Sequence, residues 1–170
     1  MRVFNETQWF NQWFMQLINY GMIAFLLYCL YMWFIAKSAV GNVMETDVTG
    51  QIVVIVAVVF SVLLLLSFKL KTKIDEVGIH YKFLPIHRNF KIIRWDEMES
   101  CEVRTYNAIT EYGGWGFKGG FGKGTAFNVK GNIGIQIVLK SGKRILIGTQ
   151  KENDAKLILK RYKNKENEGI

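Results

Sequence analysis

The sequence contains only two cysteines, two histidines and one proline among its 170 residues. Cys29 lies in a long apolar stretch and Cys101 in a polar one, so a disulfide between them would join a thiol at bilayer depth to one outside the membrane. No disulfide framework is therefore expected. His80, His87 and Cys101 do not have the spacing of a metal site. We expect no metal, no cofactor and no catalytic residue, and therefore no enzyme.

Charged residues are missing altogether between Ile52 and Phe68, where fourteen of seventeen residues are Val, Ile, Leu or Phe. As a helix with a rise of about 1.5 Å per residue, this stretch together with Gly50 and Gln51 approaches the roughly 30 Å thickness of the hydrocarbon core. A buried β-strand is the alternative, but such strands usually run for about 4 to 8 residues. The sequence therefore predicts a transmembrane helix over residues 51–68.

Another apolar stretch runs from Met15 to Ala36 and has aromatic residues at both ends. It is longer than the roughly 7 to 15 apolar residues of a signal peptide, so a transmembrane helix is predicted over residues 15–36. Gln12, Gln16 and Asn19 fall on one face of this helix. Either they hydrogen-bond to the other helix or to another copy, or two of them simply lie in the headgroup layer.

Residues 2–14 mix polar residues with the phenylalanines and tryptophans that suit a headgroup interface. Within this segment, the spacing of Asn5 and Gln8 fits the start of a helix. Residues 1–70 as a whole are therefore expected to form a transmembrane hairpin.

The positive charge lies beyond the hairpin, because residues 69–170 hold twenty of the twenty-two Lys and Arg and eleven of the fourteen acids, a net charge of +9. The loop between the helices has one lysine against two acids, whereas three lysines follow the second helix: Lys69, Lys71 and Lys73. Positive residues stay on the cytoplasmic side, so a multi-pass protein of the inner membrane with both termini in the cytoplasm is predicted. The same lysines would attract anionic headgroups.

From Lys71 onward, apolar residues recur at every second position, which predicts strands with one buried face. Such runs begin at Ile79, Cys101 and Ile133, and a turn at Ser141 and Gly142 joins the last run to residues 143–149 as a hairpin. A single helical turn is predicted at residues 95–99.

The clearest helix outside the membrane segments follows these strands. Thr149 and Glu152 have the spacing of a capping box. An apolar stripe on one face of this helix is formed by Ala155, Ile158, Leu159 and Tyr162.

Three runs in this part of the chain, Ile74–Tyr81, Ile93–Met98 and Gly142–Thr149, resemble the bacterial pleckstrin-homology-like (PH-like) domains of small membrane proteins with two spans. The resemblance covers residues 71–163 and leaves residues 164–170 as a polar tail. It implies an α+β fold, in which a bent antiparallel sheet or barrel of about seven strands is closed by the C-terminal helix and serves in binding or scaffolding. Eukaryotic domains that bind inositol phosphates use a long basic loop between their first two strands. The short connection here carries Asp75 and Glu76, which argues against phosphoinositide recognition.

A glycine-rich segment, Tyr112–Gly124, has seven glycines among thirteen residues. Its glycine spacing matches the dinucleotide fingerprint, but no helix or βαβ unit accompanies it, so nucleotide binding is not expected. Two hypotheses remain: its rings and lysines enter the headgroup layer or grip a partner, or its rings fold back onto the sheet. The predicted membrane or partner contacts are Tyr112, Trp115, Phe117, Lys118, Phe121 and Lys123, together with Lys69, Lys71 and Lys73.

These observations predict a membrane-anchored, cytoplasmic binding or scaffold module. It would hold a PH-like domain at the inner membrane surface and bind a protein partner, another copy of the chain or anionic lipid. The alternative is an accessory subunit of a membrane enzyme or transporter that acts through its hairpin. Nucleic-acid binding is not expected, because the lysines are scattered and no reading element is recognisable.

Overall fold

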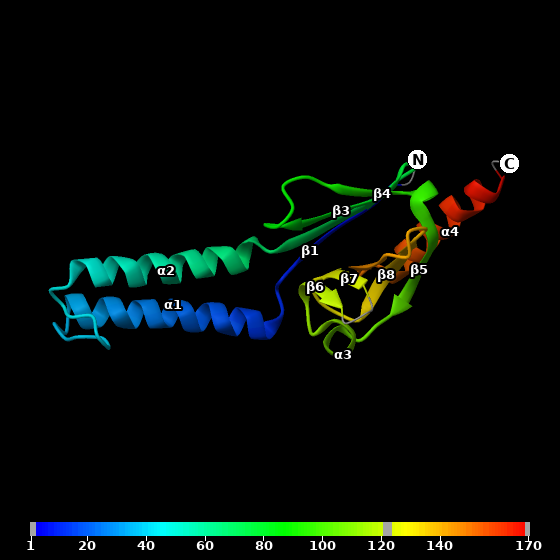
Figure 1. Ribbon diagram of the computed structural model, residues 1–170. Coiled ribbons are helices and arrows are strands. Elements are labelled where there is room, and N and C mark those ends of the chain that lie inside the picture. Colours follow the sequence, from blue (N-terminus) through cyan, green and yellow to red (C-terminus); the bar gives the residue numbers. More distant parts are fainter. Residues whose placement is uncertain (1–2, 121–123, 169–170) are drawn as a thin grey trace. The chain divides into compact units, whose positions relative to one another are not determined.

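A computed structural model of the protein describes residues 3–120 and 124–168 (Figure 1). The chain divides into two compact units. One unit comprises residues 10–67, and the other combines the residues up to Trp9 with those from Phe68 onward. The predicted hairpin of residues 1–70 is therefore too long at both ends.

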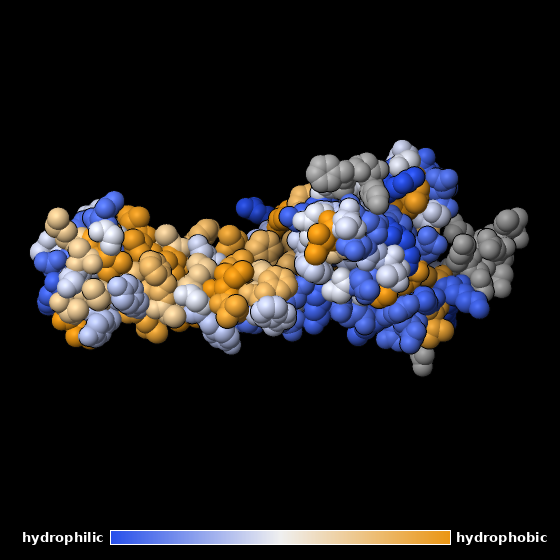
Figure 2. Space-filling model, turned by 90° about the horizontal axis from the view of Figure 1, so that it is seen from below, coloured by the Kyte–Doolittle hydropathy of each residue, from blue (hydrophilic) through white to orange (hydrophobic). Residues whose placement is uncertain are grey.

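The first unit is a hairpin of two helices, α1 (Trp13–Phe34) and α2 (Val48–Ser67), each long and apolar enough to cross a membrane. Their apolar side chains are largely exposed, for example those of Phe60 and Leu63, and Figure 2 shows hydrophobic residues over most of the hairpin surface. A helix in the core of a soluble protein would bury these side chains. The prediction of two apolar helices is confirmed, with bounds that differ by up to three residues.

Polar side chains are buried in the hairpin at two places. Gln51 donates from Nε2 to the carbonyl oxygens of Met44 (3.1 Å) and Glu45 (2.9 Å), which fastens the interhelical loop to the first turns of α2. Asn19 is buried, so this member of the predicted polar stripe has no surface to offer another copy.

In the second unit, a four-stranded antiparallel sheet has the order β1-β2-β3-β4. Its strands are β1 (Phe4–Trp9), β2 (Lys69–Ile74), β3 (Gly78–Leu84) and β4 (Lys91–Arg94). Phe4 lies opposite Ile74, and Trp9 lies opposite Lys69. In the sequence, the two helices therefore lie between two strands that are hydrogen-bonded neighbours in the sheet.

The predicted helix start at Asn5 is wrong, because residues 4–9 form β1, and Phe4 is buried in the fold rather than exposed to a headgroup layer. The inward side chains of β1 are Phe4, Glu6 and Gln8, so two of the three buried positions are polar and the usual apolar alternation is hidden. The predicted start of the soluble domain at Lys71 is also late, since β2 begins at Lys69 and buries Leu70, Thr72 and Ile74.

The other sheet has five strands in the order β5-β8-β9-β7-β6. They are β5 (Met98–Thr105), β6 (Gly116–Gly120), β7 (Gly124–Asn128), β8 (Ile133–Leu139) and β9 (Arg144–Gly148). All neighbours are antiparallel except β7 and β9, which run parallel. The described residues thus form nine strands in two separate sheets, one of them mixed, rather than the predicted bent antiparallel sheet or barrel of about seven strands.

The main core lies between the two sheets, which pack face to face. The ring of Phe127 on β7 lies 4.8 Å from that of Tyr81 and 6.2 Å from that of Phe83, both on β3. Fully buried aliphatic side chains complete this core: Leu70, Ile74, Ile79, Ile135, Ile137 and Ile147. Each such burial contributes about 1.5–3 kcal/mol to folding. The alternation predicted for β3 is confirmed, whereas β8 is buried on both faces over residues 134–137, so the prediction of a single buried face is wrong for that strand.

Hydrogen bonds from polar side chains of β1 link this strand to the end of β9. Gln8 donates from Nε2 to the Gly148 carbonyl oxygen (2.6 Å). The Glu6 carboxylate accepts from the Thr149 hydroxyl (2.6 Å) and from the Gln150 backbone N–H (2.8 Å). Because Glu6 and Thr149 are both buried, these bonds hold β1 in register with the residues that lead into the last helix.

That helix, α4 (Glu152–Glu168), buries Ala155, Ile158, Leu159 and Tyr162, as its apolar stripe predicted. The predicted capping box is absent, because Thr149 donates to Glu6, and Glu152 pairs with Lys156 at 2.6 Å. The helix also extends to Glu168, through most of the segment predicted as a tail. The helical turn predicted before β5 is confirmed as η1 (Trp95–Glu97).

The outer face of the five-stranded sheet is covered by the segment that follows β5. This segment includes the short helix α3 (Ala108–Tyr112) and forms a small second core of Tyr106, Ala108, Tyr112, Ala126 and Leu146, with Trp115 packed against it. A Cβ atom on Gly134 would lie 3.1 Å from both Tyr106 Cε1 and Leu146 Cγ, so a side chain here would require these neighbours to shift by a few tenths of an ångström. The central strands β8, β9 and β7 of the five-stranded sheet are therefore buried on both faces.

Candidate functional site

The outer face of the four-stranded sheet carries a group of lysines, here called the basic face: Lys69, Lys71, Lys73 and Lys82. Lys71 on β2 lies directly opposite Lys82 on β3. Directly opposite residues have Cβ atoms about 4.5–5.5 Å apart, and like charges at that separation destabilise a sheet. Within the described part of the chain, neither of these two lysines forms an ion pair. An anion between them would relieve the repulsion.

One end of the basic face is formed by Trp9 and Lys69. The Lys69 ammonium lies 3.8 Å from the centroid of the Trp9 ring, and half of the Trp9 surface is exposed. Such a cation–π pair contributes about 0.5–1 kcal/mol at an exposed site. Trp9 directly precedes the connection to α1, and Lys69 follows α2 after a single residue. An amphipathic ring and a cation thus lie where both chain connections leave the sheet.

The opposite end of the basic face is fixed by Asp75. Its carboxylate lies 2.9 Å from the Lys73 ammonium and 2.9 Å from His80 Nε2, and it accepts the Val77 N–H at 3.0 Å. Burial alone would raise the pKa of Asp75, but the hydrogen bonds from Lys73, His80 and Val77 outweigh it and hold the pKa well below its usual range. The positive charge of Lys73 is therefore compensated by an ion pair with Asp75, whereas Lys71 and Lys82 have no such partner among the described residues.

The Asp75 turn is also tied to the last helix. The Trp95 indole N–H donates to the Asp75 carbonyl oxygen (2.9 Å), and the Trp95 ring stacks on that of Tyr162 with centroids 5.4 Å apart. This end of the four-stranded sheet therefore cannot move independently of α4.

The predicted contact residues of the glycine-rich segment do not form one exposed loop. Tyr112 is buried in the second core, and the Trp115 indole N–H donates to the Gly131 carbonyl oxygen (3.1 Å). Phe117 on β6 is half exposed but stacks on Phe127 with centroids 5.1 Å apart and an interplanar angle of 17°. These contacts favour the hypothesis that the rings fold back onto the sheet.

The remaining members of that prediction are placed differently. Lys118 is half-buried on β6. Phe121 and Lys123 lie outside the described residues. The αL conformation of Gly113 (φ 73°) ends α3 and lets the chain turn back into β6.

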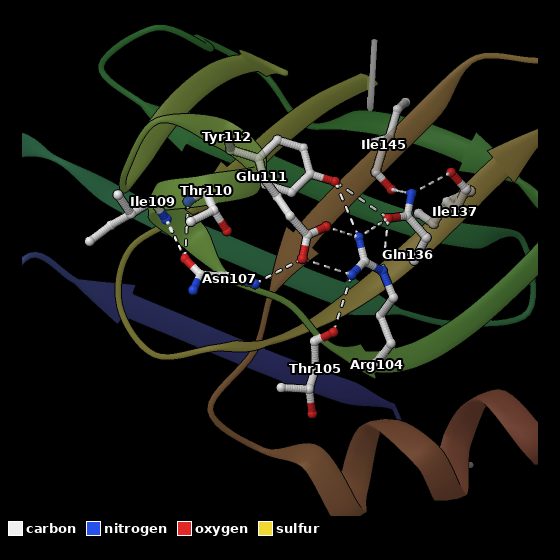
Figure 3. Close-up of polar contacts among 10 residues, drawn as sticks. All are labelled: Arg104, Thr105, Asn107, Ile109, Thr110, Glu111, Tyr112, Gln136, Ile137 and Ile145. Atoms are coloured by element: carbon white, nitrogen blue, oxygen red, sulfur yellow. Dashed lines mark hydrogen bonds and ion pairs between the residues drawn. The ribbon is translucent and has the colours of Figure 1, made fainter. Parts of the chain in front are cut away.

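A charged cluster holds α3 onto the five-stranded sheet (Figure 3). The Arg104 guanidinium lies 2.8 Å from Glu111 Oε2, and it also donates to Gln136 Oε1 (3.0 Å) and to the Thr105 carbonyl oxygen (3.1 Å). The hydrogen bond to Glu111 raises the pKa of Arg104. The Asn107 side chain accepts the N–H groups of Ile109 and Thr110 at the start of α3, both at 3.0 Å. Because these donors and acceptors satisfy one another, the cluster fastens α3 in place.

Sequence reasoning found three lysines of the basic face but missed Lys82 and Trp9. The run Lys69-Leu70-Lys71-Thr72-Lys73-Ile74 is itself a strand pattern with all its charges on one face. His80 and Lys82 alternate in the same way on β3, so placing the two strands as neighbours would have brought Lys71 and Lys82 together. Trp9 is predicted only as one of the rings of residues 2–14 that suit a headgroup interface, not as a neighbour of Lys69.

Across residues 3–120 and 124–168, no three His, Cys, Asp or Glu side chains are grouped in a way that could hold a metal ion. Cys29 and Cys101 are both free thiols. Burial lowers the pKa of His87, with a smaller contribution from Lys91, and the His87 ring lies 5.2 Å from that of Phe127. A neutral ring packed against aromatic residues in this way is suited to a structural role.

Comparison with curated proteins and with solved structures gives no match to this chain. A family model described as a family of unknown function (DUF6141) matches residues 2–160. The matched region includes both helices, both sheets and most of α4, and the chain therefore belongs to the DUF6141 family.

Proposed function

We propose that this protein is an inner-membrane binding module whose sandwich of two sheets is held at the cytoplasmic surface and binds anionic lipid headgroups through the basic face. The observation that carries the proposal is the pairing of Trp9 with Lys69, which places both connections to the helices at one end of one pair of strands. The ligand-binding surface is the pair Lys71 and Lys82, with Lys69 and Trp9 beside it.

The covalent chain keeps this end of the sheet close to the helix ends. Three residues lie between Trp9 and the start of α1 at Trp13, and one lies between Ser67 and Lys69, which makes four and two Cα-to-Cα steps. At about 3.3–3.6 Å per residue, the first connection spans at most about 14 Å and the second about 7 Å. If α1 and α2 cross a bilayer, Trp9 and Lys69 are therefore held within reach of its headgroup layer, where tryptophan and lysine are favoured.

The strand pairing also supports the predicted topology. Because β1 and β2 are neighbours in one sheet, the chain has to return to the side of the membrane from which it left, and two crossings achieve this. The lysines after α2 outnumber those of the interhelical loop, which favours the cytoplasm for that side. On an anionic cytoplasmic leaflet each exposed lysine near the surface adds about 1 kcal/mol of attraction.

The PH-like assignment forms part of this proposal. Support comes from the two facing sheets and from α4, which buries its apolar stripe against them. The parallel pairing of β7 with β9 and the strand before the hairpin were not expected from that resemblance. Binding through an open sheet face, rather than through a loop between two strands, also fits the acidic turn at Asp75 and Glu76.

The lipid proposal is tested on the full chain, purified in detergent and mixed with phosphatidylglycerol or phosphatidylcholine. Native mass spectrometry counts the lipids that stay bound. Replacing Lys71 and Lys82 together by Gln should weaken phosphatidylglycerol binding roughly tenfold or more, since each lysine contributes about 1 kcal/mol. The matched control replaces Lys140 and Lys143, in the turn between β8 and β9, and should change nothing. If both double variants retain the same number of phosphatidylglycerol molecules, the basic face is not the binding surface.

The orientation is tested separately by cysteine labelling in intact cells. A cysteine at Asn42, in the interhelical loop, should react with an impermeant thiol reagent, and one at Ser141, in the exposed turn after β8, should not. Labelling at Ser141 but not at Asn42 would place the sandwich outside the cytoplasm and would remove the anionic leaflet from the proposal.

A further inference from the structure

A groove of about 520 Å³ lies between β1 and α4. Its floor is made by the buried side chains of Phe4 and Ile158, and its walls by the exposed apolar side chains of Val3 and Leu157. Polar and charged side chains form its rim: Asn5, Lys151, Asp154 and Arg161. The groove is therefore apolar inside and has two positive charges against one negative charge at its border.

The strand that borders this groove is a sheet edge. β1 pairs with β2 on one side, and no described strand pairs with it on the other. The Lys151 ammonium donates to the Asn5 carbonyl oxygen (3.4 Å), which shows that the backbone of Asn5 points to the free edge. Since backbone groups alternate along an antiparallel strand, the N–H and C=O of Thr7 point to the same edge. These groups are available to an added strand.

We infer that this groove binds an extended, acidic segment of a partner protein, which adds to the free edge of β1. An added strand gains affinity from main-chain hydrogen bonds and specificity from alternate side chains. Its backbone N–H would take the place of the Lys151 ammonium at the Asn5 carbonyl. The released Lys151 and the neighbouring Arg161 would then pair with carboxylates of the segment, while an aliphatic side chain enters the groove beside Leu157.

The position of the groove along β1 suits a partner from the aqueous phase. Phe4 is five residues from Trp9, which is about 17 Å along an extended strand. The groove therefore lies at the end of β1 opposite the connections to the helices. Binding there does not use the basic face and does not depend on lipid binding.

The probe for this site is a short fluorescent peptide of alternating Leu and Glu, titrated against the full chain in neutral detergent and read by fluorescence polarisation. Two peptide controls separate the contributions. One has Lys in place of Glu, and the other is methylated on the backbone nitrogens of one edge, so that it keeps its side chains but cannot pair as a strand. The acidic peptide should bind at least fivefold more tightly than either control.

Variants of the protein test the same site from the other side. Leu157→Gln and Arg161→Gln change exposed side chains and should each weaken binding of the acidic peptide at least threefold, whereas Lys140→Gln, which does not line the groove, should leave it unchanged. Circular dichroism checks that each variant is folded.

Equal binding of the acidic and basic peptides, tight binding of the methylated peptide, or no binding at all would overturn the inference. So would self-association of the chain that is lost in Leu157→Gln, since the occupant would then be a second copy.

Discussion

The five-stranded sheet is covered on both faces over its central strands β8, β9 and β7, whereas the four-stranded sheet is covered on one. The first packs against the other sheet through Ile135 and Ile137 and against the second core through Leu146. The second sheet leaves its outer face open, and that face carries like charges opposite each other at Lys71 and Lys82. The difference indicates that one sheet supplies most of the stability, while the other accepts an unfavourable arrangement on a surface that is free to bind.

The largest effect is expected from Leu146→Ala in the covered sheet. Leu146 is fully buried beside Tyr106 and Tyr112, so truncation leaves a cavity and should lower the free energy of unfolding by about 2–5 kcal/mol. Thr7→Ala, on the open face of β1, should change it by less than about 0.5 kcal/mol. Chemical unfolding followed by tryptophan fluorescence measures both. Similar losses would mean that the two outer faces do not differ as described.

A smaller effect is expected when a methyl group is added to the covered sheet. Gly134→Ala places Cβ 3.1 Å from Tyr106 and Leu146, and the resulting crowding should cost about 1–3 kcal/mol. Gly119→Ala on β6 is the matched control, because no atom lies within 4 Å of its added Cβ. Thermal unfolding of both variants would distinguish them. Equal melting temperatures would show that the second core yields without cost.

The loss of stability at acidic pH should depend on Asp75, which lies at the end of the four-stranded sheet. The folded-state pKa of this carboxyl lies below the unfolded value of about 3.9. Its stabilisation is therefore complete above that pH and is lost as the pH falls through the folded-state pKa. Asp75→Asn should flatten the decline in unfolding temperature below about pH 4. Curves for wild type and variant that stay parallel throughout would exclude Asp75 as a contributor.

The smallest effect is expected on the basic face itself. Lys71→Gln removes a like-charge contact with Lys82 and should raise the free energy of unfolding by a few tenths of a kcal/mol at low salt. The gain should vanish at high salt, because screening removes the repulsion in the wild-type protein. If Lys71→Gln is more stable at low salt while the Lys71 and Lys82 double variant binds lipid more weakly, these lysines serve binding at the expense of stability. A loss of stability in Lys71→Gln would show that the lysine serves the fold.

Much of the fold follows from periodicity in the sequence. The alternation around Ile79 predicted β3, and the stripe from Ala155 to Tyr162 predicted the buried side of α4, because one face of each element meets a single apolar surface. The alternation around Ile133 located β8 as well, although both faces of that strand are buried. The same rule failed for β1, where Glu6 and Gln8 are buried against the residues that lead into α4. Local patterns do not contain such distant partners.

The candidate site was less accessible to prediction. The three lysines predict a charged exit from the membrane, and strands are predicted from Lys71 onward, but the pairing of this run with the strand around Ile79 is not, so Lys82 is not placed beside Lys71. The glycine-rich segment has no alternation because glycine gives no apolar signal, which concealed both β6 and the burial of Tyr112. These features depend on which strands become neighbours, and only the assembled sheets show that.

The insertion of the hairpin between β1 and β2 also imposes an order on biosynthesis. The ribosome completes β1 before it makes either helix, and the partner strand β2 appears only after both. Where the helices enter a bilayer, β1 has to wait unpaired until the second one has returned the chain to the starting side. A chain that inserted only one helix would keep the two strands on opposite sides of the membrane and could not complete its sheet. Folding of the sandwich would then act as a built-in check that the membrane segment has been inserted correctly.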